Sequence, residues 1–337
     1  MNSEILKSDV QKFINDNLST DIHKILLRSS PFPNISSKDL VEQIESKKKA
    51  KEKLPSWFTA ENIIYPNKLN LSQTSSEVTA DYKASLVKGK SLIDITGGLG
   101  IDTFAFSKKM DSVVHVEKNE FLSNIAKHNF KQLGVENVQF ETGDGINFIK
   151  KSKRKFDIIY ADPSRRDEEN NKVYYLSDCE PDITQHLDFL FTIANTILVK
   201  TAPMLDIQIG LNQLQNVSEI HVVAINNDVK EIIWLLNKNT SQNPDIKTIN
   251  FTKKKPQVFE FKLDSENSTF VSYSLPKNYL YEPNAAILKS GGFNQVAQRF
   301  HVEKLHPNSH LYTSTELINF PGRVFKILNI ADYSKKS

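Results

Sequence analysis

The fold is decided by the stretch Leu92-Ile93-Asp94-Ile95-Thr96-Gly97-Gly98-Leu99-Gly100, in which a short apolar run leads into three glycines. Short apolar runs of this kind are typical of strands that are buried on both faces of a sheet. Glycine lets the backbone turn tightly and approach a ligand, and a helix that begins after such a turn has an electropositive N-terminus. The stretch therefore predicts a strand, a ligand-binding turn and then a helix over residues 102–109.

Short apolar runs continue to alternate with helical patterns from residue 91 to about residue 265. One helix is expected to follow residue 225 and to pass through Ile232, Trp234 and Leu235. Such alternation predicts an α/β fold with a parallel, doubly wound, Rossmann-like sheet. We expect its strands at residues 92–95, 112–116, 138–141, 156–161, 196–200, 219–225 and 258–263.

The two ends of the chain differ from this pattern. Residues 1–85 carry apolar side chains at helical spacing, which predicts an N-terminal helical region. Residues 266–337 contain short strand-like pieces separated by prolines, which predicts a small C-terminal α+β domain. We therefore expect three parts, with the sheet domain over residues 86–265.

The composition is that of a globular protein, with 39% hydrophobic and 25% charged residues in a chain of 337. A net charge of +3 permits nucleic-acid binding but does not predict it. The single cysteine, Cys179, excludes a disulfide within the chain and favours a reducing compartment. No signal peptide is recognisable, and no apolar run approaches the roughly 20 residues of a membrane helix, so we expect a cytoplasmic protein without membrane contact.

Three acidic residues follow three successive strands of the predicted sheet. Asp94 ends the first, Glu117 ends the second, and Asp144 follows the third within Gly143-Asp144-Gly145. Carboxylates repel a pyrophosphate, but they accept hydrogen bonds from an ammonium group, ribose hydroxyls or an adenine amino group. The pattern favours a neutral or cationic nucleoside as ligand; the alternative is that Glu117 and Asp144 only cap helices.

A second motif, Asp162-Pro163-Ser164-Arg165-Arg166, follows the predicted strand 156–161. The Asp162 carboxylate and the Pro163 carbonyl can both accept hydrogen bonds from an amino group and so orient its lone pair. The arginines can stack on a base or bind phosphate, with pairing to nearby acids as the alternative. Lys200, at the end of strand 196–200, lies on the substrate side of such a sheet, where it can bind phosphate or stabilise charge on a base, or simply extend into solvent.

These motifs resemble those of class I S-adenosylmethionine (SAM)-dependent methyltransferases over about residues 85–265. The pattern Asp94-x-Thr96-x-Gly98-Leu99-Gly100-x-Asp102 is also similar to that of bacterial guanine-N2 methyltransferases of small-subunit ribosomal RNA. The whole chain resembles bacterial class I methyltransferases with a THUMP-like C-terminal domain, through Tyr281–Ala286, Leu305–Tyr312 and Phe320–Val324. The resemblance implies use of SAM over residues 86–265, a THUMP-like domain over residues 266–337, and RNA as substrate.

The resemblance also implies roles for single residues. In amino-methylating relatives an aromatic residue usually stands where Arg165 stands here and stacks on the flipped base. Tyr160, Tyr174 or Tyr175 could supply that ring, with packing in the core or at a rim as the alternative. The implied catalytic residues are Asp162 and Pro163; the implied substrate-binding residues are Ser164, Arg165, Arg166 and Lys200; the implied cofactor-binding residues are Asp94, Thr96, Gly97, Gly98, Gly100, Asp102, Glu117, Asp144 and Gly145.

The acceptor expected from these features is a base, with nitrogen favoured, in structured RNA such as tRNA or rRNA. Basic and aromatic residues alternate around His301, His306 and His310, which fits contacts with phosphates and unpaired bases. The spacing of these histidines matches no standard zinc site, so no metal is expected. Two alternatives stay open: a methyltransferase acting on a protein or small molecule, and a non-catalytic RNA-binding protein with a relic methyltransferase fold.

Overall fold

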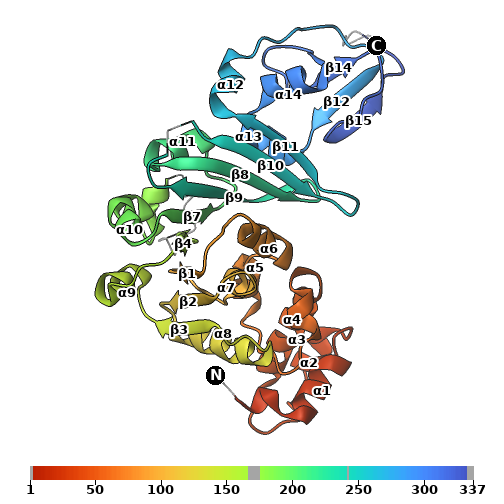
Figure 1. Ribbon diagram of the computed structural model, residues 1–337. Helices are drawn as coiled ribbons and strands as arrows, with labels where there is room; N and C mark the ends of the chain where they lie inside the picture. The colour runs from red at the N-terminus through yellow and green to blue at the C-terminus, as the bar shows by residue number, and fades with distance from the viewer. Residues whose placement is uncertain (1–2, 166–174, 241–242, 332–337) are drawn as a thin grey trace. The chain divides into compact units, whose positions relative to one another are not determined.

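The computed structural model describes residues 3–165, 175–240 and 243–331 (Figure 1). The chain forms two compact units. The first consists of residues 1–161 with 192–195, and the second of residues 162–191 with 196–337.

The first unit begins with helices, which confirms the predicted helical region. Ser36 starts one of them, and Ser76 another, with a capping box in which the side chain and the backbone of the cap are both hydrogen-bonded. Val10, Ile14, Leu40 and other apolar residues of these helices form a core of their own. The elements are η1 (Ser3–Leu6), α1 (Ser8–Asp16), α2 (Ile22–Leu26), α3 (Ser37–Lys53), α4 (Pro55–Thr59), α5 (Lys68–Gln73) and α6 (Glu77–Ser85).

Four parallel strands complete the first unit, in the order β4-β1-β2-β3. β1, β2 and β4 are apolar and largely buried, because helices cover such sheets on both faces, whereas β3 at the end of this order is partly exposed. Since the strands are parallel, the turns that follow β1, β2 and β3 lie at one edge of the sheet. The elements are β1 (Ser91–Asp94), α7 (Ile101–Ser107), β2 (Ser112–Glu117), α8 (Glu120–Gln132), β3 (Val138–Thr142), α9 (Gly145–Ser152) and β4 (Ile158–Ala161).

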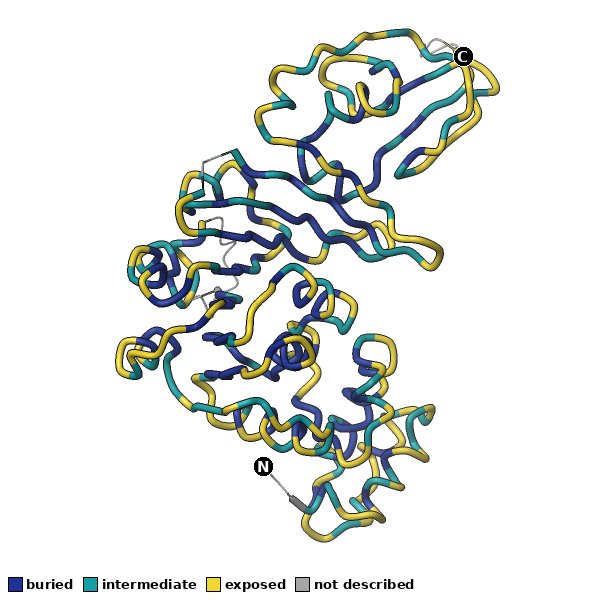
Figure 2. The backbone as a smooth tube through the Cα atoms, viewed as in Figure 1, coloured by how far each residue is buried: buried dark blue, intermediate teal, exposed yellow. Residues whose placement is uncertain are grey.

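Five strands of the second unit lie side by side in the order β11-β10-β8-β9-β7. The pair β8–β10 is parallel and the other neighbours are antiparallel. Figure 2 shows the middle strands buried along most of their length. The elements are β5 (Ser164–Arg165), η2 (Leu176–Asp178), β6 (Cys179–Glu180), η3 (Ile183–Gln185), α10 (Leu187–Ile193), β7 (Thr196–Thr201), α11 (Ile207–Gln213), β8 (Val217–Ile225), β9 (Asp228–Asn237), β10 (Asp245–Phe251) and β11 (Gln257–Lys262).

The helix predicted through Ile232, Trp234 and Leu235 is wrong, because these residues lie in strand β9. Two residues, Asn226 and Asn227, connect β8 to β9, and their φ angles are 50° and 66°. Positive φ at both positions is the conformation of the tight hairpin turn that asparagine favours. The two strands therefore pair directly, and the apolar run is buried on both faces as a central strand.

The C-terminal part of the second unit is a small α+β structure, as predicted. Its four-stranded antiparallel sheet has the order β13-β14-β12-β15, and Tyr281, Tyr312 and Phe320 pack together in its core. The domain boundaries expected after residues 85 and 265 stay predictions. The elements are α12 (Leu263–Ser268), β12 (Tyr279–Pro283), α13 (Ala285–Ser290), α14 (Phe293–Phe300), β13 (Glu303–Lys304), β14 (Tyr312–Ser314) and β15 (Gly322–Lys326).

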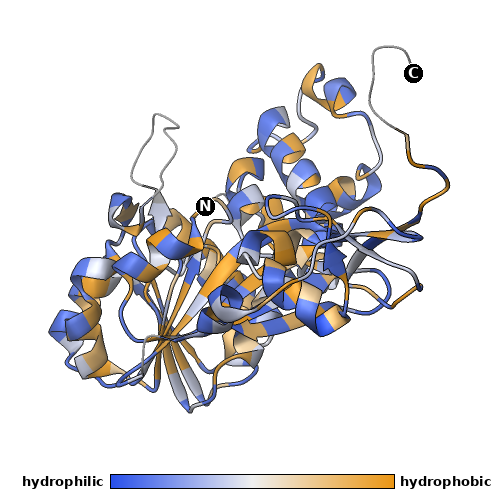
Figure 3. Cartoon of the chain, turned by 90° about the horizontal axis from the view of Figure 1, so that it is seen from above, coloured by the Kyte–Doolittle hydropathy of each residue, from blue (hydrophilic) through white to orange (hydrophobic). Residues whose placement is uncertain are grey.

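Hydropathy follows this architecture. Apolar residues colour much of the strand ribbon orange, while many helices carry alternating polar and apolar residues (Figure 3). Among the described residues, none of the helices combines the length and the apolar character that crossing a membrane would require.

Candidate functional site

The turn after β1 depends on its glycines. Gly98 and Gly100 have φ angles of 54° and 83°, which disfavour residues with a side chain. A Cβ atom on Gly97 would lie 2.3 Å from Nε2 of His115, so the turn lies directly on β2. A Cβ atom on Gly98 would meet only the Thr96 carbonyl oxygen, at 3.9 Å, so the space beside Gly98 is open.

Asp94 fixes this turn from the end of β1. Its side chain is buried; one carboxylate oxygen accepts a hydrogen bond from the Thr96 N–H at 3.0 Å, and the other accepts one from the Thr103 hydroxyl at 2.7 Å. The carboxylate thus joins the turn to the first helical turn of α7. This geometry supports an indirect role, in which Asp94 and Thr96 shape the turn.

Glu117 links the turn after β1 to the end of β2. One of its carboxylate oxygens accepts a hydrogen bond from Gly98 N–H at 2.6 Å, and the other accepts one from Asn119 N–H at 2.7 Å. Each carboxylate oxygen has a second lone pair, so the group can still accept hydrogen bonds from a diol. Glu117 is half-buried at the edge of the sheet.

Asp144 and Gly145 lie where β3 leads into α9. The Asp144 carboxylate accepts a hydrogen bond from Asn147 N–H at 2.8 Å and so caps the helix, as the alternative interpretation proposed. A Cβ atom on Gly145 would lie 2.4 Å from the Ile95 carbonyl oxygen, so α9 begins directly against the turn after β1. The ends of β1, β2 and β3 therefore meet. Their open glycine turn and their carboxylates fit a nucleoside with a positive charge, such as SAM.

Asp102 belongs to a buried polar network beneath the turn. Its carboxylate accepts hydrogen bonds from the Ser75 hydroxyl at 2.9 Å and the Tyr160 hydroxyl at 2.8 Å. The Lys83 ammonium lies 3.1 Å from its other oxygen, and the Lys83 side chain has no exposed surface. The network ties α6 to α7 and β4, so Asp102 supports the site from below. The sequence analysis did not predict roles for Lys83 and Ser75. For Tyr160 it left two roles open, stacking on a base or packing in the core, and the ring is buried in the core.

His115 is a second buried polar residue beneath the turn. Burial lowers the pKa of its imidazole from 6.5 to about 4, so the ring is neutral at physiological pH. Its ring also contacts Phe140, with centroids 5.0 Å apart. A neutral ring of this size fills the space beneath Gly97, where no side chain fits.

The Asp-Pro motif belongs to the second unit. Lys200, on β7, directs its ammonium group to the Asp162 carboxylate at 2.6 Å, and both side chains are largely buried. A cation at this distance stabilises the negative charge of the carboxylate. The sequence reading placed Lys200 on the substrate side of the sheet but did not foresee this partner.

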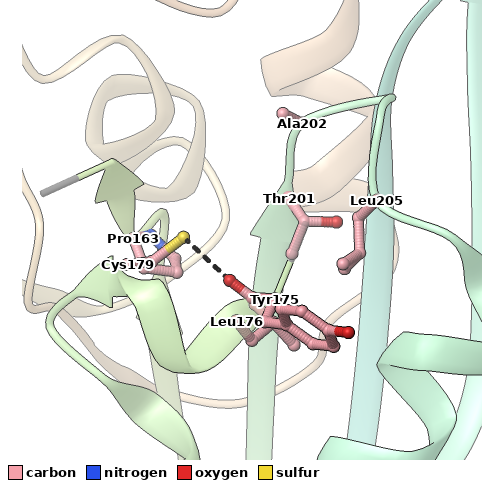
Figure 4. Close-up of a pocket in the computed structure, with 7 residues that line it drawn as sticks. All are labelled: Pro163, Tyr175, Leu176, Cys179, Thr201, Ala202 and Leu205. Carbon is pink, nitrogen blue, oxygen red and sulfur yellow. Dashed lines mark hydrogen bonds between the residues drawn. The ribbon is translucent and has the colours of Figure 1, made fainter. Parts of the chain in front are cut away.

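The rest of the motif forms strand β5. Ser164 pairs with Glu180 and Arg165 pairs with Cys179 across the β5–β6 ladder. Ser164 is exposed; for Arg165 only the backbone is described, and Arg166 and Tyr174 lie outside the described residues. A small cavity next to Pro163 is lined by Pro163, Tyr175, Leu176, Cys179, Thr201, Ala202 and Leu205 (Figure 4). No group of three or more histidine, cysteine, aspartate or glutamate side chains in the described part of the chain could hold a metal ion.

Two protein families match parts of the sequence. The family described as "Conserved hypothetical protein 95" matches residues 74–178, which include both the glycine turn and the Asp-Pro motif. A ferredoxin-like domain matches residues 279–321.

The chain is also similar to several known proteins. Two curated relatives are an uncharacterized RNA methyltransferase of Mycoplasma mobile, 31% identical over 94 residues (27% of this chain), and a protein-L-isoaspartate O-methyltransferase of Thermotoga maritima, 34% identical over 79 residues (23% of this chain). The chain spans about a quarter of the length of these curated relatives, 25% in each case. A solved structure, that of a candidate methyltransferase from Porphyromonas gingivalis W83, is 34% identical and has a TM-score of 0.87.

This last similarity covers 99% of the present chain and 84% of the Porphyromonas protein. It confirms the predicted Rossmann-like fold, the enzyme class and the use of SAM, whereas the C-terminal domain matches as ferredoxin-like. Because the agreement extends over both units and both motifs, the chain belongs to the class I SAM-dependent methyltransferase family.

Proposed function

We propose that this methyltransferase modifies a base, preferably at a nitrogen, in structured RNA such as tRNA or rRNA. The observation that carries the proposal is the Asp162-Pro163 motif, with the Asp162 carboxylate held by Lys200 at 2.6 Å. A base amino group is a weak nucleophile because its lone pair is delocalised into the ring. Two fixed acceptors, the Asp162 carboxylate and the Pro163 carbonyl, would orient that lone pair for attack.

In this proposal the first unit holds the cofactor, which supplies an electrophilic methyl group when bound. Gly98, beside which the turn is open, would leave room for it, and Gly97 and Gly100 would let the turn pack closely on the residues beneath. Glu117 would accept hydrogen bonds from its ribose, and Asp144 and Gly145 would border the adenine. Asp94, Thr96 and Asp102 keep the turn in shape from beneath. No strong base is required of the chain, because the amino proton becomes acidic only as the new bond forms.

Three observations support RNA as the substrate. The sequence Ser164-Arg165-Arg166 places cationic residues directly after the motif. His301 and His306 are exposed in the C-terminal part, although Lys304 is buried and His310 stacks on Phe293 with ring centroids 3.6 Å apart. The Mycoplasma relative carries the name of an RNA methyltransferase.

The remaining expectations belong to the same proposal. Residues 86–265 would form the methyltransferase domain and residues 266–337 a THUMP-like domain that binds RNA, in a protein of the cytoplasm. The single cysteine of the chain, Cys179, supports a reducing compartment.

The test is incubation of the protein with isotopically labelled SAM and total RNA from a strain that lacks the gene. Nucleoside mass spectrometry then identifies the labelled nucleoside. We expect one methylated base, and no label with RNA from the parent strain, in which the position is already modified. Label in protein or in small molecules would favour a methyltransferase that acts on those substrates. No methyl transfer at all would favour a non-catalytic RNA-binding protein with a relic methyltransferase fold.

A further inference from the structure

Glu231 is an acidic residue in the interior of the second unit. It belongs to β9, which is exposed or half-buried over Asp228–Lys230 and buried from Glu231 to Leu236. Glu231 is 2% exposed, and it is the one charged residue in the buried run Glu231-Ile232-Ile233-Trp234-Leu235-Leu236. A buried carboxylate is stable only where cations or hydrogen-bond donors compensate its charge. An acid at this position therefore implies such groups on its side of the sheet.

The register of the sheet places Glu231 on the same face as Lys200. Lys200 of β7 pairs with Ile233 of β9, and Glu231 lies two residues before Ile233. Side chains two residues apart leave a strand on the same face, and diagonal neighbours on adjacent strands are within reach of long side chains. Trp234 and Thr201 share the opposite face, where the indole N–H donates to the Thr201 hydroxyl at 2.9 Å. Lys200 and Glu231 are therefore neighbours on the face that carries the ion pair of the Asp-Pro motif.

A β-bulge lies directly before Glu231. In the pairing of β9 with β8 the register shifts at this point, so that Lys230 is an extra residue in β9. Bulges redirect side chains and are frequent beside active sites. Lys230 pairs with Asp228, and the two side chains are 45% and 70% exposed. The bulge thus leaves the cation of this pair of neighbours at the surface and the acid, Glu231, in the interior.

The ammonium group of Lys200 can bind more than one carboxylate. It carries three N–H donors, and it donates to the Asp162 carboxylate at 2.6 Å. The Lys200 side chain is 14% exposed, so water has little access to it. A second carboxylate on the same face would accept another of the three hydrogen bonds and favour the charged form of the lysine. It would also restrict the rotation of a long side chain that has several rotatable bonds.

We infer that Glu231 positions Lys200 and, through it, the Asp162 carboxylate. This inference rests on the proposed function. Glu231 is too deeply buried to touch the substrate, and it would share the ammonium group with Asp162, so that the cation lies between two carboxylates. With Lys200 fixed from both sides, Asp162 keeps the orientation that the acceptor group requires.

The kinetic test is a double-mutant cycle of Glu231→Gln and Lys200→Met, measured with labelled SAM and RNA from the deletion strain. Glu231→Gln keeps the size of the side chain but removes its charge, and it should lower kcat about five- to tenfold because Asp162 loses its fixed orientation. The RNA KM should stay within about twofold, since a buried residue does not meet RNA phosphates. In the Lys200→Met background the same substitution should change kcat less than about twofold, because the residue through which it acts is gone. Glu231→Asp, which retains the charge, should keep more activity than Glu231→Gln.

Unfolding in urea, followed by circular dichroism, gives a second readout that needs no RNA. In the wild-type background Glu231→Gln should lower the midpoint of the transition, because the Lys200 ammonium loses a carboxylate partner. In the Lys200→Met background it should instead raise the midpoint, because Glu231 and Asp162 are two neighbouring buried carboxylates that repel each other without their cation. A shift in the same direction in both backgrounds would overturn the inference.

Glu219→Gln is the matched control. Glu219 lies on β8 of the same sheet, and its carboxylate binds the Lys247 ammonium at 2.6 Å. The substitution therefore removes an acid from another lysine pair, and it should leave kcat unchanged. An equal loss of kcat in Glu219→Gln and Glu231→Gln would show a general effect on the sheet and would contradict the inference.

The inference and the proposed function can fail separately. If Glu231→Gln has the wild-type kcat while Asp162→Ala is inactive on the same RNA, or if the effects of Glu231→Gln and Lys200→Met on kcat multiply, the inference is wrong and the proposed function stands. If the wild-type protein labels no RNA, the proposed function is wrong, and the urea midpoints still decide whether Glu231 acts on Lys200.

Discussion

The ammonium group of Lys200 lies 2.6 Å from the Asp162 carboxylate, at the point where the Asp-Pro motif meets strand β7. The side chains are 14% and 30% exposed, so the pair is largely removed from water. A carboxylate in such a place needs a cationic partner to stay charged and to keep its orientation. We therefore propose that Lys200 positions Asp162.

Asp162→Ala should lower kcat at least about 100-fold, because it removes a preorganised acceptor from the reacting group. Affinity for SAM should stay within about threefold, since the cofactor turn belongs to the first unit. Methyl transfer to RNA and calorimetric binding of SAM are the two measurements. Unchanged turnover would contradict the assignment of Asp162 as catalytic.

Lys200→Met should lower kcat about tenfold or more, because Asp162 would lose the cation that fixes its rotamer. Lys200→Arg keeps the charge and should retain more activity. If Lys200 instead bound RNA phosphate, Lys200→Met would raise the RNA KM and leave kcat unchanged. A full kinetic comparison of the two variants distinguishes these roles.

Glu117→Gln should weaken the binding of SAM about tenfold, since a charged acceptor contributes about 1.5–3 kcal/mol to a hydrogen bond and a neutral amide less. The same substitution weakens the contact with Gly98 N–H, at present 2.6 Å. Calorimetry with the demethylated product of SAM measures the effect without turnover. Glu120→Gln, at the exposed first residue of α8, is a control that should bind normally.

Lys83→Met should lower the free energy of unfolding by about 3–5 kcal/mol, because it leaves a buried carboxylate without its cation. The Lys83–Asp102 pair is 3.1 Å long, with side chains 0% and 10% exposed. Lys108→Met is the control: its pair with Asp81 is exposed, so its removal should cost at most about 1 kcal/mol. Similar losses in the two denaturant titrations would argue against the network as a support.

The stability should fall as the pH is lowered from about 6.5 to about 4, in part because of His115. In the unfolded chain the imidazole takes up a proton near pH 6.5, whereas in the folded protein its pKa is about 4. Between these values the unfolded state binds more protons, and the full effect is on the order of 3 kcal/mol. His115→Leu should flatten this part of the pH profile measured by denaturant titration.

The sequence was sufficient for the parts of the fold that depend on local patterns. The glycine turn and the strands that precede Gly97 and Asp162 follow from neighbouring residues. The helix expected at Trp234 failed because an apolar run buried on both faces has no period of its own. The pair Asn226-Asn227 favours a hairpin turn, and a hairpin turn at this point makes the following apolar run a strand and not a helix.

The sequence indicated candidate site residues but not their contacts. Asp94, Glu117 and Asp162 could be chosen because they end strands. The partners of Asp102 and Asp162 could not, since Lys83 and Lys200 come from distant elements and pair only once the chain is folded. Similarly, Tyr175 and Pro163 line one cavity beside the β5–β6 ladder, which forms only in the folded chain.

Asn227 has a second partner besides its own turn. Its N–H donates to Asn250 Oδ1 at 2.9 Å, while its side-chain oxygen accepts from Ala285 N–H at 2.7 Å, at the first residue of α13. Asn227 therefore forms part of the β8–β9 turn and also binds the first residue of α13. A C-terminal part grafted from a relative would keep this contact only where the hairpin offers a side-chain acceptor at the position of Asn227.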